Sequence, residues 1–241
     1  MLKTCLCLIG TGRSIQHTHA NLRENLIEPF GKDCDVFIHT IDSPFLSDIR
    51  DIFEADHQVK LITSEKEPEY DLSGYRFKSN WPPAGQSTKQ VYIKMINSRK
   101  NMGEVLLKYE KENNTTYDRV IFSRMDVKYF KKVAIQVGGI DLDKLHVPDF
   151  HNIFGGSIDG YNDRFAIGNR ENMGIYFRVP DSIDDFLSDG GSIHAETLLK
   201  WHLASNDIST EKVPVRFTRT RADGTDIDLR LAKGDLERRD T

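Results

Sequence analysis

The sequence predicts a single α/β domain built on a mostly parallel central sheet with helices on its faces. In the first third of the chain, short apolar runs alternate with segments of helical periodicity, which is the order typical of βαβ units and parallel strands. The 241 residues are enough to bury a sizeable core. No internal repeat, low-complexity stretch or compositional linker divides them. We therefore expect one domain over residues 1–241.

The first five elements follow from apolar runs and the turns that bound them. The opening run LKTCLCLIG is short and ends in a glycine turn, which is typical of a strand. In the next segment Leu22, Leu26 and Ile27 recur at helical spacing, and Gly31 ends the helix. The expected elements are strands over 3–9, 35–40 and 58–63, and helices over about 15–29 and 44–54.

A long polar segment separates these elements from the middle of the chain. Residues 64–85 contain Trp81 and three prolines and show neither period, so we expect a functional or mobile loop that covers a ligand site. A long helix is predicted over 86–112. Its expected inner side is marked by Val91, Met95, Met102, Leu106 and Tyr109, and its cationic side chains include Lys89, Lys94, Arg99 and Lys100.

The second half of the sequence is less regular. A buried strand, DRVIFS, is expected at 118–123. Further short strands are expected over 145–149 and 164–168, a helix over 194–205, and a late strand over 213–221.

Charge and cysteine content restrict the class of protein. Lys and Arg total 33 against 37 Asp and Glu, a formal charge of −4, which argues against a general nucleic-acid binder. No apolar run has the length of a membrane span, and no signal peptide opens the sequence. Cys5, Cys7 and Cys34 form neither a disulfide framework nor a metal-site spacing. We expect a soluble protein of a reducing compartment, the cytoplasm.

The first candidate site is the turn after the opening strand, which contains Gly10, Thr11, Gly12, Arg13 and Ser14. Glycines let a backbone approach a ligand closely, Ser14 can cap the helix that follows, and a helix N-terminus favours an anion. The turn lacks the third glycine of a dinucleotide fingerprint and the lysine of a P-loop. A tight strand-to-helix turn without a ligand is an equally good interpretation.

The second candidate site is the Arg-Met-Asp tripeptide that ends the buried strand. Arg124 and Asp126 stand two residues apart, so they point to the same side of an extended chain. A carboxylate at such a strand end can bind a hard divalent cation, and an arginine can contact phosphate or pair with the aspartate. An isolated Arg-x-Asp also fits a structural ion pair that caps the strand.

Two acidic residues lie downstream, near glycine-rich turns. Asp163 is either a turn-forming aspartate or a group that holds a substrate hydroxyl. Glu196 stands near a helix start, where a carboxylate is stabilised by backbone amides, or it serves as a general base.

Taken in order, these pieces resemble a GT-A glycosyltransferase that carries Arg-x-Asp in place of Asp-x-Asp. The chain also resembles small soluble enzymes of large algal (chlorella) viruses that build capsid glycans. The resemblance extends over about four-fifths of the chain. Its pieces are CLCLIGTGRS, DVFIHT, the long helix before YDRVIFSRMDVKYF, DRFAIGNRENM and HAETLLKWHL.

The resemblance implies a GT-A-like (Rossmann-like) fold, a UDP- or GDP-linked sugar donor, Mn²⁺ or Mg²⁺, and a glycan or glycoprotein acceptor. It implies a nucleotide-binding half over 1–130 and an acceptor or sugar half over 131–241. Asp126 would bind the metal, and its lone carboxylate implies weak metal affinity or metal-independent turnover. Asp163 and Glu196 would face donor sugar and acceptor, with Glu196 as the base. The nucleotide would be bound by Gly10, Thr11, Gly12, Arg13, Ser14, Lys94 and Arg124.

Two other functions stay open. The chain can be a non-catalytic nucleotide- or carbohydrate-binding domain of the same fold, an idea that the arginine at the first position of the motif favours. It can also be another nucleotide-dependent transferase, such as a nucleotidyltransferase or a methyltransferase.

Overall fold

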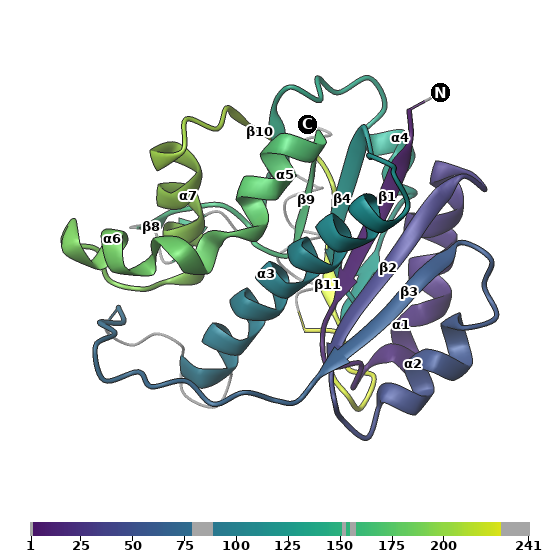
Figure 1. Ribbon diagram of the computed structural model, residues 1–241, viewed down its shortest axis with the longest axis horizontal. Helices are drawn as coiled ribbons and strands as arrows, with labels where there is room; N and C mark the ends of the chain where they lie inside the picture. Colours follow the sequence, from purple (N-terminus) through teal and green to yellow (C-terminus); the bar gives the residue numbers. More distant parts are fainter. Residues whose placement is uncertain (1, 79–88, 151–152, 155–157, 228–241) are drawn as a thin grey trace.

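The centre of the computed structural model is a seven-stranded sheet flanked by helices (Figure 1). The structure describes residues 2–78, 89–150, 153–154 and 158–227. The strand order is β10-β6-β9-β4-β1-β2-β3. Strand β9 runs antiparallel to its neighbours β4 and β6, and the other neighbouring strands of this sheet are parallel. The predicted α/β class with a mostly parallel central sheet is confirmed.

The central-sheet strands are β1 (Thr4–Ile9), β2 (Cys34–Ile41), β3 (Val59–Glu65), β4 (Arg119–Arg124), β6 (Leu145–Pro148), β9 (Phe165–Gly168) and β10 (Thr210–Val213). Two small ribbons pair β5 (Val127–Tyr129) with β11 (Phe217–Arg219) and β7 (Ile153–Phe154) with β8 (Ile158–Asp159). The α-helices are α1 (Ile15–Leu22), α2 (Leu46–Phe53), α3 (Lys89–Glu112), α4 (Val133–Gln136), α5 (Arg170–Phe177), α6 (Ile183–Ser188) and α7 (Ala195–Ser205). The π-helical η1 (Arg23–Ile27) and the 3₁₀ helices η2 (Glu28–Phe30) and η3 (Val179–Ser182) complete the elements.

Side chains alternate along β1, so a single apolar run contributes to the hydrophobic cores on both faces of the sheet. Cys5 and Cys7 point into the core on one face of the sheet, and Leu6 and Leu8 point into the core on the other. All four are fully buried. A strand covered on both faces needs no polar residues, which is why LKTCLCLIG reads as a continuous apolar stretch.

Helices from distant parts of the chain cover the two faces (Figure 1). On one face, α3 crosses the sheet diagonally and packs against α5, which in turn contacts α7; Ile96, Met173 and Leu198 belong to the core that these helices share. On the other face, α1 and α2 contribute residues such as Leu22 and Phe53. No helix among the described residues is long and apolar enough to cross a membrane.

The inner side predicted for the long helix is partly wrong. Val91 is 52% exposed, whereas Tyr92, Ile93 and Ile96 are buried. Val91 lies on the side of α3 that lines the pocket described below. At the start of α3, the residues that face the sheet are therefore Tyr92 and Ile96, each one position after the predicted Val91 and Met95. Arg99, expected only as a cation, is itself buried.

Within the late strand predicted over 213–221, the structure has β11 and only the last residue of β10, and most of β10 precedes the predicted range. β10 joins the edge of the main sheet, whereas β11 pairs with β5 in a separate ribbon. Pro214 follows β10 directly and has no N–H to donate, so the ladder stops there. The helices over 170–177 and 183–188 were not predicted.

The polar segment after β3 is described up to residue 78. Its last residues pair with the segment that precedes α7, through Lys78 N to Ile193 O at 3.0 Å and Ile193 N to Arg76 O at 2.8 Å. Trp81 lies outside the described residues, and the proposal of a mobile loop over the site stays a prediction.

Candidate active site

A pocket of about 370 Å³ opens at the carboxyl ends of β1, β2 and β4. We call it the switch-point pocket because the strand order reverses there. From β1 the chain builds β2 and β3 on one side, then returns through α3 to place β4 on the other side. Ligands of open α/β sheets bind outside the carboxyl ends of strands at such a reversal. The predicted residues Gly10, Thr11, Gly12, Arg13, Ser14, Lys94, Arg124 and Asp126 all line this pocket.

The glycine turn lines this pocket, and Gly12 within it cannot be replaced without steric conflict. Gly12 has φ +74°, and a Cβ there would lie 2.6 Å from Cδ1 of Ile49 in α2. A side chain is therefore excluded at Gly12 by conformation and by space. Ser14 occupies the N-cap position of α1 but makes no side-chain capping bond, so the expected cap is wrong. Its backbone is at φ −111° and ψ 8°, outside the extended region from which N-cap side chains reach the first turn.

Arg124 and Asp126 form a bidentate ion pair beside the pocket. Arg124 Nε donates to Asp126 Oδ1 at 2.9 Å, and Nη2 donates to Oδ2 at 2.6 Å. Both side chains remain about one-fifth exposed, at 20% and 18%. Burial opposes ionisation of Asp126, but Arg124, Arg219 and Arg164 together hold its pKa below the ordinary value. The carboxylate is thus ionised and occupied by its neighbour.

This geometry does not fit a metal held by the protein. Both oxygens of Asp126 accept hydrogen bonds from Arg124. The described part of the chain contains no group of three or more His, Cys, Asp and Glu side chains arranged to hold a metal. Divalent cations of the Mg²⁺ and Mn²⁺ type are bound through oxygen ligands that are free to coordinate. The expected Mn²⁺ or Mg²⁺ would first have to displace Arg124.

Lys94 lines the pocket but is engaged by the polar segment after β3. Its Nζ lies 3.2 Å from a carboxylate oxygen of Glu67 and 2.5 Å from one of Glu69. These contacts attach the described part of that segment to the rim of the pocket. A phosphate at Lys94 would compete with two carboxylates.

A second group of charges lies next to the pocket and brings Asp163 and Glu196 together. Arg164 bridges them, with Nη1 3.9 Å from Asp163 Oδ1 and Nη2 3.6 Å from Glu196 Oε1. The backbone of Arg164 is tied to the end of β4, because its carbonyl accepts from Arg124 N at 3.3 Å. The two acidic residues, far apart in sequence, therefore share one arginine whose backbone is bonded to the end of β4, although neither they nor Arg164 line the switch-point pocket itself.

Asp163 is a buried carboxylate held by two arginines. Arg99 Nη2 donates to its carbonyl at 3.0 Å and lies 3.5 Å from its carboxylate. The Arg99 guanidinium stacks over the rings of Phe122 and Tyr176, with 5.1 and 4.7 Å to the centroids. Burial raises the pKa of Asp163, but Arg164 and Arg99 lower it more, so the net pKa is below the ordinary value.

Glu196 has the opposite electrostatic environment. It is 7% exposed in the first turn of α7, and its pKa rises to about 7, first through burial and further through Asp163, against the charge of Arg164. The backbone of Gly160 packs so closely that a Cβ there would lie 2.6 Å from the Glu196 carbonyl carbon. A solvent-exposed capping glutamate would have neither this burial nor this raised pKa.

His194 lies beside Glu196 and is neutral near pH 7. Its Nδ1 is 3.3 Å from Glu196 Oε2. Burial lowers the pKa of His194 to about 4, with Lys78 adding to the effect. The two groups therefore do not form an ion pair at neutral pH, and Glu196 keeps its raised pKa.

A third segment close to the pocket, the turn after β11, was not predicted from the sequence. Arg219 lies opposite Val127, and Thr220 N donates to the carbonyl of Asp126 at 2.8 Å. The same turn reaches α1, where His17 Nε2 lies 3.2 Å from Ala222 O. The run VRFTRTR contains three arginines, and two of them, Arg219 and Arg221, stand at alternate positions. This pattern could have indicated a cationic site, but the run was predicted only as a late strand. Arg164 was missed as well, because nothing in its local sequence distinguishes it.

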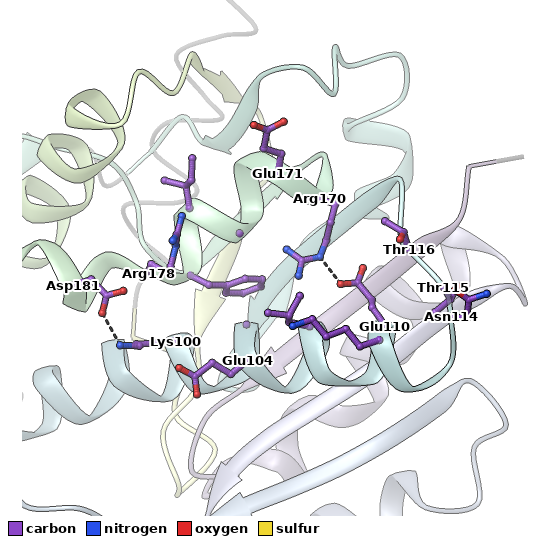
Figure 2. A pocket seen from close by; sticks show the side chains of 16 residues that line it. Lys100, Glu104, Glu110, Asn114, Thr115, Thr116, Arg170, Glu171, Arg178 and Asp181 are labelled. Atoms are coloured by element: carbon purple, nitrogen blue, oxygen red, sulfur yellow. Dashed lines mark hydrogen bonds and ion pairs between the residues drawn. The ribbon is translucent and has the colours of Figure 1, made fainter.

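The described residues also line a larger hollow of about 1160 Å³ between α3 and α5, the α3–α5 groove (Figure 2). It contains none of the predicted site residues. Its charges pair with each other: Lys100 Nζ lies 2.6 Å from Asp181 Oδ1, and Arg170 Nε lies 2.7 Å from Glu110 Oε2. It lies toward the opposite end of α3 from the switch-point pocket.

The structure is that of an α/β protein with a pocket at the reversal of a mostly parallel sheet. The chain matches the model of the domain of unknown function DUF7796 over residues 1–219 and belongs to that family. No curated protein matches the sequence.

Two solved structures show what the backbone is similar to. The apo form of the glycosyltransferase GlyE from Streptococcus pneumoniae TIGR4 is 14% identical, with a TM-score of 0.49 over 88% of this chain. The chain spans 46% of the GlyE chain, less than half of its length. Apo mouse xyloside xylosyltransferase 1 is 10% identical, with a TM-score of 0.49 over 87% of this chain and 84% of its own.

Proposed function

We propose that the protein is a glycosyltransferase that moves a sugar from a UDP- or GDP-linked donor to a hydroxyl of a glycan or glycoprotein. One observation carries this proposal: a pocket lined by Gly10, Gly12, Arg13 and Arg124 at the reversal of the sheet is linked through Arg164 to a buried carboxylate, Glu196, with a pKa of about 7. The pocket suits an anionic nucleotide, and the carboxylate suits a proton acceptor.

Donor binding would use the end of β1 and the start of α1. A side chain is absent where the turn passes Gly12, so backbone N–H groups can approach a phosphate closely. The N-terminus of α1 favours negative charge, and Arg13 adds a cation at the same rim.

The transfer step would use Glu196 as general base. The acceptor hydroxyl oxygen attacks the anomeric carbon, and its proton passes to the Glu196 carboxylate. The bond between that carbon and the diphosphate oxygen breaks, and its electron pair leaves with the nucleoside diphosphate. This is the base requirement of a single inverting displacement. Asp163 and Glu196 have pKa values shifted in opposite directions, which is the arrangement that assigns different roles to two carboxyl groups.

Asp163 would have a positioning role. Its ionised carboxylate holds Arg164, and Arg164 in turn lies between it and Glu196. An ionised Asp163 also raises the pKa of Glu196, which makes Glu196 a stronger base near neutral pH.

The resemblance to algal-virus enzymes extends the proposal to capsid glycoprotein synthesis in the host cytoplasm and to hexosyl or pentosyl donors. The motif that carries it is Arg-x-Asp, which here is a closed ion pair.

A non-catalytic nucleotide-binding domain is the second candidate. The closed pair of Arg124 and Asp126 favours it, because a carboxylate fully occupied by an arginine is not arranged for metal-assisted chemistry. This candidate predicts nucleotide binding without turnover.

The experiment is a hydrolysis screen over UDP- and GDP-linked sugars, with and without Mn²⁺ and in EDTA. The wild-type protein is compared with Glu196→Gln and with Glu171→Gln, which removes a carboxylate in the α3–α5 groove. A glycosyltransferase releases sugar slowly from one donor, and Glu196→Gln reduces that release while Glu171→Gln does not. Binding of a nucleoside diphosphate with no release from any donor would favour the binding domain, and stabilisation by S-adenosylmethionine instead would indicate a methyltransferase.

A further inference from the structure

Four arginines gather around the Arg-x-Asp motif from three separate parts of the chain. Arg13 and Arg124 line the switch-point pocket. Arg219 and Arg221 flank Thr220, whose N–H donates to the Asp126 carbonyl at 2.8 Å. The ribbon of β5 and β11 thus fixes two cations beside the carboxylate that the motif provides.

These arginines lie close enough for their charges to interact, so the electrostatic potential around them is positive. The pKa of Arg221 is lowered by burial and then by the charges of Arg219, Arg13 and Arg124. Two of these arginines, Arg124 and Arg219, act together with Arg164 to hold the pKa of Asp126 below its ordinary value although burial opposes ionisation. Like charges held together in a partly enclosed site bind anions tightly, because the field is already arranged when the anion arrives.

Asp126 is the anion that Arg124 binds in the absence of a ligand. Arg124 offers it two parallel hydrogen bonds, the same bidentate geometry that it would offer a phosphate. Both groups are about one-fifth exposed, so a ligand in the pocket can reach them. A second carboxylate in place of Arg124 would have made a metal site, but the residues present supply positive charge instead.

We propose that the diphosphate of the donor binds directly to Arg13, Arg124, Arg219 and Arg221 in place of a divalent metal, and that Asp126 is a competing internal anion. This inference rests on the proposed function, since it names how that site recognises its donor. Asp126 is then a positioning residue: it holds Arg124 in the empty pocket and is displaced by the diphosphate. The consequence is opposite to that of a metal ligand, because loss of the Asp126 charge strengthens donor binding.

Calorimetric titration tests this with UDP, GDP and inorganic pyrophosphate as probes, in EDTA and in Mn²⁺. The proteins are wild type, Asp126→Asn, Arg124→Gln and Arg219→Gln. The matched control is Asp143→Asn, which removes an exposed carboxylate just before β6. Asn keeps the shape of Asp126 and still accepts one hydrogen bond from Arg124.

The proposal predicts wild-type affinity that differs less than about threefold between EDTA and Mn²⁺. Asp126→Asn should bind about tenfold more tightly, since one like charge close to the anion is removed. Arg124→Gln and Arg219→Gln should each bind about tenfold more weakly, and Asp143→Asn should match wild type. Thermal melting of each variant shows that it is folded, and Arg219→Gln carries the test if Asp126→Asn does not fold.

Two results would overturn the inference and leave the proposed function standing: binding that requires Mn²⁺ and is lost in Asp126→Asn, or unchanged affinity in all arginine variants. Absence of binding to any of the three probes under all conditions would overturn the proposed function itself, and the inference with it.

Discussion

The two hollows of the molecule differ in a way that their sizes do not predict. The α3–α5 groove, about 1160 Å³, is much the larger, yet its cations and anions neutralise each other across it (Figure 2). The switch-point pocket, about 370 Å³, is lined by two glycines, Gly10 and Gly12, and by two arginines, Arg13 and Arg124. Charge balance and position in the topology therefore favour the switch-point pocket as the candidate ligand site over the larger groove.

The groove has a structural explanation that needs no ligand. A Cβ on Gly103 of α3 would lie 2.7 Å from the Phe177 Cβ of α5, so the two helices pack closely beneath the groove. Above this contact, Arg170 reaches Glu110, whose side chain is only 7% exposed. The charged side chains there join two helices.

The largest effect is expected from Glu196→Gln. The amide keeps the size of the side chain but cannot accept a proton, so the transfer rate should fall by roughly 10²–10⁴. Donor affinity should stay within a few-fold, because the base acts on the acceptor. The measurement is the rate at saturating substrates together with the donor dissociation constant. Turnover near that of wild type would remove Glu196 as the base and leave Asp163 to be tested.

The pH dependence of the reaction follows from the same residue. A general base works as a carboxylate, so the rate should rise with pH through the raised pKa of Glu196, about 7, and fall about tenfold per pH unit below it. Glu196→Gln should lose this rise. A rate that increases only near pH 4 would show that a carboxyl group with an ordinary pKa is responsible.

Gly12→Ala should damage the pocket and spare the groove. The new Cβ would meet Ile49 at 2.6 Å and would have to adopt φ +74°. We expect a loss of about 1–3 kcal/mol in the free energy of unfolding, measured by denaturant titration, and weaker donor binding. Gly139→Ala is the control, since it has φ +78° but no atom within 4 Å of its Cβ. Equal losses in both variants would assign the effect to backbone conformation alone.

Arg170→Gln should disturb the α3–α5 groove and leave the switch-point pocket intact. It leaves the buried carboxylate of Glu110 without its partner at 2.7 Å, so we expect a loss of about 2 kcal/mol in stability. Nucleoside diphosphate affinity should be unchanged. If Arg170→Gln weakens that binding while the pocket arginine variants do not, the groove is the ligand site and the comparison is reversed.

The smallest effect is expected from Lys94→Gln. Lys94 lines the pocket, but its ammonium group already contacts Glu67 and Glu69. Its removal should change nucleoside diphosphate affinity by less than about threefold, because those contacts are surface ion pairs that a phosphate would have to replace. A tenfold loss would show that donor binding breaks both contacts and recruits Lys94.

The sequence predicted the parts of this molecule that depend on local patterns. The parallel strands, the glycine turn and the long α3 follow from periodicity, and the residues at strand ends converge because carboxyl ends share one edge. β9 runs antiparallel, but a four-residue apolar run contains no information about direction. The helices α5 and α6 were not predicted because segments this short contain too few turns to show a helical period.

The site was harder to predict where it depends on long-range contacts. The pairing of Arg124 with Asp126 was one of two alternatives, since i and i+2 geometry allows both a pair and a ligand site. The roles of Arg164 and Arg219 arise from segments that meet only in the folded chain. The raised pKa of Glu196 comes from burial against residues distant in sequence.

The pairing of β11 with β5 makes the surroundings of the pocket depend on a segment that is synthesised after all the strands of the central sheet. A nascent chain can form the parallel core and the glycine turn as soon as β4 emerges, but Thr220 must still be added before its N–H reaches Asp126. Domains fold on the ribosome largely from the first-made segments onward, and contacts between distant segments form slowly. A ribosome-bound chain stopped before β11 would thus carry Arg124 paired to Asp126 without Arg219 and Arg221 beside them. The set of arginines around Asp126 would then be complete only once β11 and the turn after it have been made.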